Sequence, residues 1–281
     1  MGVSLAYLSS PLSLFSRRKF NEFITDNPPN SMLSNGTTST FWLLFHTLQS
    51  PDLLSAARAE LEACRISPST THTTNTGWVG LSSTDLNTSL LVSQPLLQSL
   101  YAETLRKYIS VYLTRRTEFA PVQILDYFIP QNRTIVVNSA MAHMDPANFN
   151  EGAEKRQPVT RFWGERFLLP GKLGNASAYE QDPSPTHSPG AMVDEKEVGQ
   201  STFSLDKYKG AWIPFGGGAH QCPGRHWVKV QMVVSLALFI KGFEIELLDQ
   251  REGQEVKVDM RRYGMGALEP GERVRGRVRR R

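Results

Sequence analysis

The segment over residues 212–231 constrains this chain most, because three consecutive glycines precede a cysteine and a strongly helical run. The glycines at 216–218 carry no Cβ atoms, so the backbone there can approach a flat or bulky group closely. Cys222 is followed by Pro223, and proline is favoured at the first position of a helix. We therefore expect Cys222 at or beside a helix N-terminus, where the helix dipole and free N–H groups stabilise a thiolate.

The residues around Cys222 leave several chemical roles open. A thiolate in this setting can bind a metal or act as a nucleophile. His220, two residues earlier, adds a hydrogen-bond donor or a positive charge. A buried, inert cysteine is the alternative that these residues also allow.

The overall composition is that of an ordinary globular protein. The 281 residues are 40% hydrophobic and 21% charged, which suits one large domain or two smaller ones. Cys64 and Cys222 are the two cysteines, so a fold held by several disulfides is excluded, and we expect Cys64 to be a passive helix residue. No run approaches the ~18 apolar residues of a membrane-spanning helix.

The net charge of +4 is concentrated at the C-terminal end. Residues 251–281 hold nine Arg and one Lys against five acidic residues, while the rest of the chain is close to neutral. Basic tails can bind nucleic acid or anionic membranes. Because no aromatic residues alternate with the basic ones, we expect a solvated terminus that is rich in β-strand, and no nucleic-acid partner.

Hydrophobic periodicity predicts a mainly α fold with short strands. The expected helices cover residues 13–27, 38–65 with a break at 50–51, 94–113 and 224–240. The expected strands cover residues 121–129, 133–138, 243–248 and 272–280, with a turn at Gln131 and Asn132. Polar residues at 66–84 and 170–210 predict long loops.

The cysteine segment resembles a known family. Phe215, Gly218, Cys222 and Gly224 fit the pattern Phe-x-x-Gly-x-x-x-Cys-x-Gly, and Arg225 follows. This pattern resembles the haem-binding loop of cytochromes P450. The resemblance implies a P450-like fold, mainly α with small β-sheets, and haem b whose iron takes its axial thiolate from Cys222.

Further matches follow the family's order. The segment Glu103-Thr-Leu-Arg106 places an acidic and a basic residue on one face of a helix. The segment Phe162-Trp-Gly-Glu-Arg166-Phe resembles the family's Pro-Glu-Arg-Phe segment, with Gly164 in place of Pro. The resemblance implies that Glu103, Arg106 and Arg166 form a structural trio that supports the cysteine loop. A solvated surface pair is the alternative for Glu103 and Arg106.

A stretch over residues 128–149 resembles two further family segments, an Ile-Pro-x-Gly strand turn and a His-x-Asp-Pro motif. Asn132 stands where the glycine of the turn is usual. The family also implies contacts to the haem itself. His220 matches a propionate-contacting position, Phe215 packs near the cysteine side of the haem, and either Arg115 or Arg116 can bind a propionate.

The expected oxygen-activating helix departs from the family pattern. Residues 31–40 contain no acidic residue, although the family usually relays protons there through an acid and a hydroxyl. Asn35 stands at the position of the usual threonine, and Thr37 and Thr38 are the alternative hydroxyls. This arrangement resembles the branch that contains sterol 7α-hydroxylases and prostacyclin synthase.

The resemblance implies a monooxygenase that oxidises a lipophilic small molecule. A role in the biosynthesis of specialised metabolites would suit such an enzyme. It would use O₂ and electrons from NADPH–cytochrome P450 reductase or a similar donor, which Arg225 and Lys229 can meet. Two alternatives stay open: a haem-thiolate isomerase or dehydratase that needs no reductase, and a non-catalytic fragment.

The chain is shorter than the family's full length, so we expect an N-terminally truncated form of the domain. Residues 1–30 are then an N-terminal remnant, and residues 31–281 are the haem-binding C-terminal part, with 170–210 as a surface loop. The full-length family lies at the cytosolic face of the endoplasmic reticulum membrane. We expect this chain, which lacks an anchor, to be cytoplasmic, with membrane contact only through a missing N-terminal part.

Overall fold

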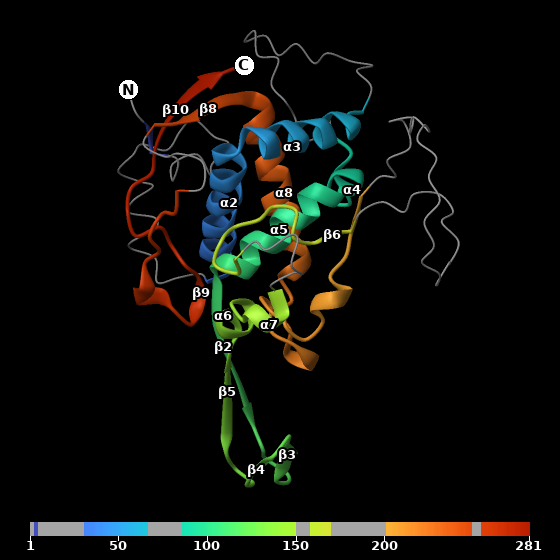
Figure 1. Cartoon of the computed structure of the whole chain (residues 1–281), viewed down its shortest axis with the longest axis vertical. Helices are drawn as coiled ribbons and strands as arrows, with labels where there is room; N and C mark the ends of the chain where they lie inside the picture. The colour runs from blue at the N-terminus through green and yellow to red at the C-terminus, as the bar shows by residue number, and fades with distance from the viewer. Residues whose placement is uncertain (1–2, 5–30, 67–85, 150–157, 170–200, 249–253) are drawn as a thin grey trace, which may run out of the picture.

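The structure is a computed structural model that describes residues 3–4, 31–66, 86–149, 158–169, 201–248 and 254–281 (Figure 1). The expected helix at 13–27 lies outside these residues. So do nearly all of the expected loop at 66–84 and most of the loop at 170–210.

Two long helices, α2 and α8, pack against each other at the centre of the fold, and α5 packs on both (Figure 1). Gly36 of α2 lies against α8, and a Cβ atom there would lie 2.6 Å from Oε1 of Gln231, so that side chain would have to move. The helices of the described part are α2 (Ser31–Gln49), α3 (Pro51–Ala63), α4 (Thr88–Leu91), α5 (Pro95–Tyr108), α6 (Ser139–His143), α7 (Pro146–Phe149) and α8 (Arg225–Gly242).

Small antiparallel sheets flank these helices. Their orders are β1-β10-β8, β5-β2-β9, β3-β4 and β6-β7. The strands are β1 (Val3–Ser4), β2 (Ile109–Arg116), β3 (Val122–Ile124), β4 (Tyr127–Ile129), β5 (Thr134–Asn138), β6 (Leu168–Leu169), β7 (Thr202–Phe203), β8 (Phe243–Leu247), β9 (Met265–Ala267) and β10 (Arg275–Arg280). The predicted class, mainly α with small β-sheets, is therefore confirmed.

The predicted helix over 94–113 is wrong at its C-terminal end. α5 stops at Tyr108, and β2 begins at Ile109. Ile109 and Leu113 continue the helical spacing, but they pair instead with Ala267 of β9 and Val137 of β5. Pairing with strands that are distant in the sequence decides this segment, which a local pattern cannot show.

The predicted strand at 121–129 is a hairpin. β3 and β4 pair antiparallel, and Leu125 takes the turn with φ of 51°. The predicted turn at 131–132 is confirmed, and Asn132 has φ of 62°. Asparagine tolerates this left-handed conformation better than most residues, so it can stand where the family usually has glycine.

The break inside the predicted helix at 38–65 is confirmed. α2 begins earlier than predicted, at Ser31, and α3 starts with Pro51 at its first position. The Leu53 N–H donates to Oγ of Ser50 at 3.5 Å, which caps α3. The predicted helix at 224–240 is confirmed as α8, but its N-cap is Gly224, so Pro223 precedes the helix instead of opening it.

An aromatic stack ties α2 to α5 in the buried core. The rings of Trp42 and Tyr108 are parallel with centroids 4.0 Å apart, and Nε1 of Trp42 donates to the carbonyl of Leu268 at 2.6 Å. His46 hydrogen-bonds the Tyr108 hydroxyl at 2.7 Å and stacks on Phe162 at 3.9 Å. These contacts fix the helices that carry the candidate site.

Candidate functional site

The cysteine loop is a tight backbone arch that leads into α8. The Cys222 N–H donates to the carbonyl of Phe215 at 2.9 Å, which closes the arch. Gly216 and Gly218 have φ of 75° and 69°, a left-handed region that favours glycine. Cys222 is half-buried, carries a free thiol and lies three residues before Arg225, the first residue of α8.

Space is open over the glycine run. A Cβ atom added at Gly217 or Gly218 would meet no atom of the described residues within 4 Å, and at Gly216 it would meet only the tip of Leu113, at 3.1 Å. Contacts with the described residues therefore do not require the glycines of this loop. Backbone conformation at two of them and room for a bulky group account for the run.

Glu103, Arg106 and Arg166 form a fully buried ion-pair cluster. Arg106 binds the Glu103 carboxylate in a bidentate manner, with Nε–Oε2 of 2.6 Å and Nη2–Oε1 of 2.8 Å. Nε of Arg166 donates to the same Oε2 at 3.0 Å. All three side chains are inaccessible to solvent, so the solvated-pair alternative does not apply.

The two arginines determine the charge state of Glu103. Burial alone would raise the pKa of this carboxyl, but the positive charges of Arg106 and Arg166 hold it below its ordinary value. The Trp163 N–H adds a hydrogen bond to Oε1 at 2.9 Å. The carboxylate therefore stays ionised, and each of its oxygens accepts at least two hydrogen bonds.

Gly164, which stands where the family pattern has proline, is explained by packing. A Cβ atom at this position would lie 2.7 Å from Cδ2 of Leu100 and 3.0 Å from Cδ2 of Leu53. A larger residue would therefore require the side chains of Leu100 and Leu53 to move.

The fold and the cysteine loop can be compared with known proteins. The family model described as "Cytochrome P450" matches residues 34–269. The chain belongs to the cytochrome P450 family. A crystal structure of a cytochrome P450, CYP102L1, has the same fold with a TM-score of 0.57 at 20% identity, covering 88% of this chain and 42% of that one.

Curated P450 relatives cover most of this chain. It is 33% identical over 254 residues to "Cytochrome P450 monooxygenase fsoE" of Humicola fuscoatra, which covers 88% of this chain and 40% of that protein. It is 27% identical over 243 residues to "Cholesterol 7-alpha-monooxygenase" of Cricetulus griseus, covering 84% and 40%. The second match confirms the predicted resemblance to the sterol 7α-hydroxylase branch. The chain spans about 40% of the length of these relatives.

The residues of the cysteine loop fit the haem of a P450. The open face of the glycine run admits a flat macrocycle, and the thiol of Cys222 is free to bind iron. Phe215 packs edge-on against Trp212 with centroids 6.2 Å apart, and Nε1 of Trp212 anchors this pair to the Ala102 carbonyl of α5 at 3.0 Å.

Arg115 is the better placed of the two candidate propionate ligands. Its Nη2 donates to the Gly217 carbonyl at 2.8 Å, which holds the guanidinium beside the glycine run. Arg116 is the next residue of the same strand, so its side chain points to the opposite face of β2. His220 lies exposed in a short 3₁₀ turn over Gly218–His220, where it can reach an anionic group.

The two basic residues proposed to meet a reductase differ in their surroundings. Nη1 of Arg225 donates to the Cys222 carbonyl at 3.1 Å, so this residue supports the loop. Lys229 is half-buried and its Nζ donates to Oε1 of Gln98 at 2.6 Å. Burial lowers the pKa of the Lys229 ammonium group. Arg225 and Lys229 are therefore not simply two charges that face solvent, because each contacts another part of the chain.

Asn35 joins α2 to the closing strands. Its Oδ1 accepts the Ala267 N–H of β9 at 3.0 Å. A Cβ atom at Gly266 would lie 2.3 Å from this oxygen, so the strand approaches the amide closely. Thr38 follows one helical turn after Asn35 and shares its face of α2, whereas Thr37 lies on another face.

We expect Asn35→Ala to destabilise the chain by about 1–3 kcal/mol, because the Ala267 N–H loses its acceptor in a partly buried site. Asn35→Asp keeps an oxygen at the same place and is the matched control. Urea unfolding followed by far-UV circular dichroism measures both. An alanine variant as stable as the parent chain would show that this hydrogen bond carries no weight.

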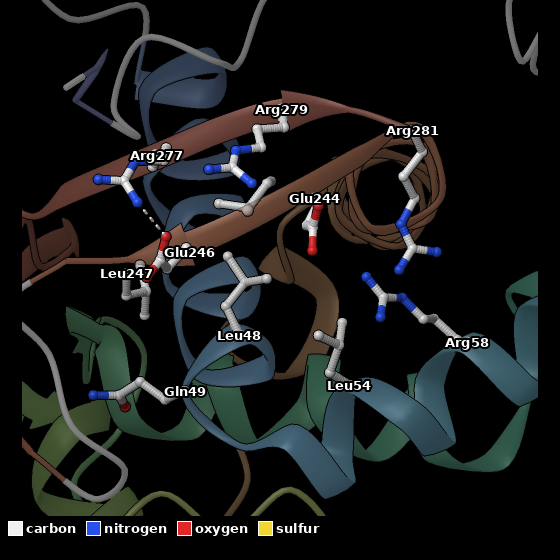
Figure 2. Close-up of a pocket in the computed structure, with 11 residues that line it drawn as sticks. Leu48, Gln49, Leu54, Arg58, Glu244, Glu246, Leu247, Arg277, Arg279 and Arg281 are labelled. Atoms are coloured by element: carbon white, nitrogen blue, oxygen red, sulfur yellow. Dashed lines mark hydrogen bonds and ion pairs between the residues drawn. The ribbon is translucent and has the colours of Figure 1, made fainter. Parts of the chain in front are cut away.

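A cavity of about 410 Å³ lies at the other end of α8 from Cys222 (Figure 2). Arg58 of α3 and Arg281 approach one another there, and Arg277 pairs with Glu246 at 3.0 Å. An 18-residue helix rises about 27 Å. The cavity is therefore separate from the cysteine loop. Three of its arginines, Arg277, Arg279 and Arg281, belong to the basic C-terminal segment, and Arg58 belongs to α3.

Proposed function

We propose that this chain carries the haem-thiolate centre of a cytochrome P450 monooxygenase, with Cys222 as the axial ligand of haem b. The observation that carries this proposal is the cysteine loop. A cysteine with a free thiol lies just before a helix N-terminus, and it follows a glycine run with open space beside Gly217 and Gly218 among the described residues. Haem ligated by a thiolate supplies the chemistry of O₂ activation, since the thiolate favours O–O cleavage.

The chain's own residues then hold and orient the group. Cys222, three residues before the first residue of α8, would supply the thiolate to the iron. Arg115 and His220 would bind the propionates of the haem, and Phe215 would pack on the side that carries Cys222. Glu103, Arg106 and Arg166 fix α5 and the segment before α8 relative to one another, a structural role.

On α2, we assign proton handling to the face that carries Asn35 and Thr38. The Asn35 oxygen is engaged by Ala267, so its Nδ2 donor and the Thr38 hydroxyl are the groups that can hold a proton donor near the substrate. Thr37 stays the alternative hydroxyl. Residues 31–40 hold no carboxylate that could supply this proton.

For substrate and partner, we propose a lipophilic small molecule and an NADPH-dependent reductase or similar electron donor. Fungal relatives named as P450 monooxygenases support a role in specialised metabolism. The membrane of the endoplasmic reticulum is the proposed location of the full-length protein. In the described part of the chain, no helix is long and apolar enough to cross a bilayer.

A haem-thiolate isomerase or dehydratase is the second candidate function. It is favoured by one observation, the absence of an acid beside Asn35 in α2. Such an enzyme rearranges an oxygenated substrate and needs no electrons from a reductase. Turnover that requires both NADPH and a reductase would exclude it.

The test of the proposed function is the reduced, CO-bound absorbance spectrum of the 281-residue chain supplied with haem. We expect the red-shifted Soret band that indicates thiolate ligation. A haem complex with the band of neutral ligation would contradict the assignment of Cys222. A chain that takes up no haem would favour the third interpretation, a non-catalytic fragment.

A further inference from the structure

We propose that His143 is a positioning residue that holds the backbone in front of the cysteine loop and links it to the buried ion-pair cluster. This proposal rests on the proposed function for its consequence at the haem. The hydrogen bonds that carry it join residues of the chain itself. The sequence marks His143 only as part of a His-x-Asp-Pro segment of no assigned role.

The imidazole contacts the loop directly. The Ile213 N–H donates to Nε2 of His143 at 3.0 Å, and the histidine, the last residue of α6, is completely buried. Because Nε2 accepts this bond, it carries no proton, so a neutral ring must hold its proton on Nδ1. Burial lowers the pKa of His143 to about 4, which keeps the ring in this neutral form.

The backbone of the same residue contacts the ion-pair cluster. Nη1 of Arg106 donates to the His143 carbonyl at 3.0 Å, while the rest of its guanidinium binds Glu103. Beyond Ile213, the Gly216 N–H donates to the Ile213 carbonyl at 3.1 Å. His143 thus stands between a rigid buried charge cluster and the first residues of the arch that ends at Cys222.

The other ring nitrogen, Nδ1, bears on why a histidine stands at this position. Nδ1 is buried near the backbone of Arg106 and Ile109, but it makes no hydrogen bond of normal geometry with the described residues. Leaving a buried donor unpaired costs on the order of 1–3 kcal/mol. Packing alone would be served better by a phenylalanine, since the ring already meets Phe149 edge-on with centroids 6.5 Å apart. The acceptor at Nε2 is what histidine adds.

Three substitutions of His143 separate the effect of its hydrogen-bond acceptor from the effect of its size. His143→Phe keeps a ring of similar size without an acceptor. His143→Gln reaches the position of Nε2 with an amide oxygen, and His143→Asn keeps polarity but falls short of that position. If His143→Phe proves insoluble, His143→Asn carries the same test.

The first readout is amide hydrogen exchange of residues 212–222 in the haem-free chain. We expect the phenylalanine and asparagine variants to exchange about tenfold faster at Ile213 than the parent chain, because the bond to Nε2 is lost. The glutamine variant should stay within about twofold of the parent. Equal exchange in all four chains, or glutamine behaving like phenylalanine, would overturn the proposal.

The second readout is the reduced, CO-bound spectrum after haem loading. The phenylalanine and asparagine variants should show a larger share of the neutral-ligation band, and glutamine should restore the band of the parent chain. A merely structural role would lower the folded fraction of every variant without changing this share. If the parent chain takes up no haem, the proposed function fails, while the exchange measurement still decides the role of His143.

Discussion

Replacing Cys222 by serine should remove the red-shifted Soret band of the reduced, CO-bound chain. The thiolate of Cys222 is the proposed soft donor to iron, and a serine hydroxyl is a poor ligand of iron at neutral pH. The fold should survive, because Sγ has no hydrogen-bond partner among the described residues and the arch is closed by backbone groups. Absorbance spectra and far-UV circular dichroism of both chains measure the two effects.

Cys64→Ser is the matched control for this experiment. Cys64 is fully buried at the end of α3, and its Sγ donates to the Glu60 carbonyl at 3.2 Å. Burial raises the pKa of this thiol, which keeps it protonated and unreactive. The band should therefore be unchanged in Cys64→Ser. If the band survives in Cys222→Ser and disappears in Cys64→Ser, Cys64 is the ligand and the assignment to Cys222 is wrong.

The sequence predicts those parts of the fold whose signals are local. The break before Pro51, the turn at Asn132 and the helix after Cys222 each follow from residue types at a few neighbouring positions. The end of α5 does not, since Ile109 and Leu113 fit a helix as well as a strand. Only the pairing of β2 with β5 and β9 decides between them, and these strands are far away in the chain.

In the candidate site too, some residues are predicted from local motifs and others only from the folded structure. Cys222 and the trio of Glu103, Arg106 and Arg166 are found through motifs with fixed spacing. The role of His143 is not, because it depends on one backbone N–H, that of Ile213, from a segment 70 residues away. The choice between Arg115 and Arg116 likewise needs the strand's orientation, which the order of two adjacent arginines cannot give.

Glu103→Gln should strongly destabilise the described core. The side chain keeps its shape but loses its charge, so Arg106 and Arg166 remain buried without a counter-ion. Breaking a buried pair in this way costs about 3–5 kcal/mol, a large share of the 5–15 kcal/mol that stabilises a typical domain. We expect the variant to unfold at a much lower urea concentration or to aggregate on expression.

The control is Glu246→Gln, which removes one partner of the ion pair with Arg277 shown in Figure 2. Those two side chains are 60% and 50% exposed, so water screens the pair and we expect little change in stability. Equal destabilisation of the two variants would show that burial of the Glu103 cluster is not what matters. A stable Glu103→Gln chain would remove the structural role assigned to the trio.

The pH dependence of stability tests the cluster of Glu103, Arg106 and Arg166 independently. The pKa of Glu103 is lower in the folded chain than its ordinary value of about 4.3, so the unfolded state binds the proton more tightly. The stabilisation from ionised Glu103 is therefore complete above that ordinary value and is lost as the pH falls toward the lower folded pKa. The parent chain should lose more stability than a soluble Glu103→Gln variant over this acid range. Urea titrations at a series of pH values measure the difference, and parallel curves for the two chains would contradict it.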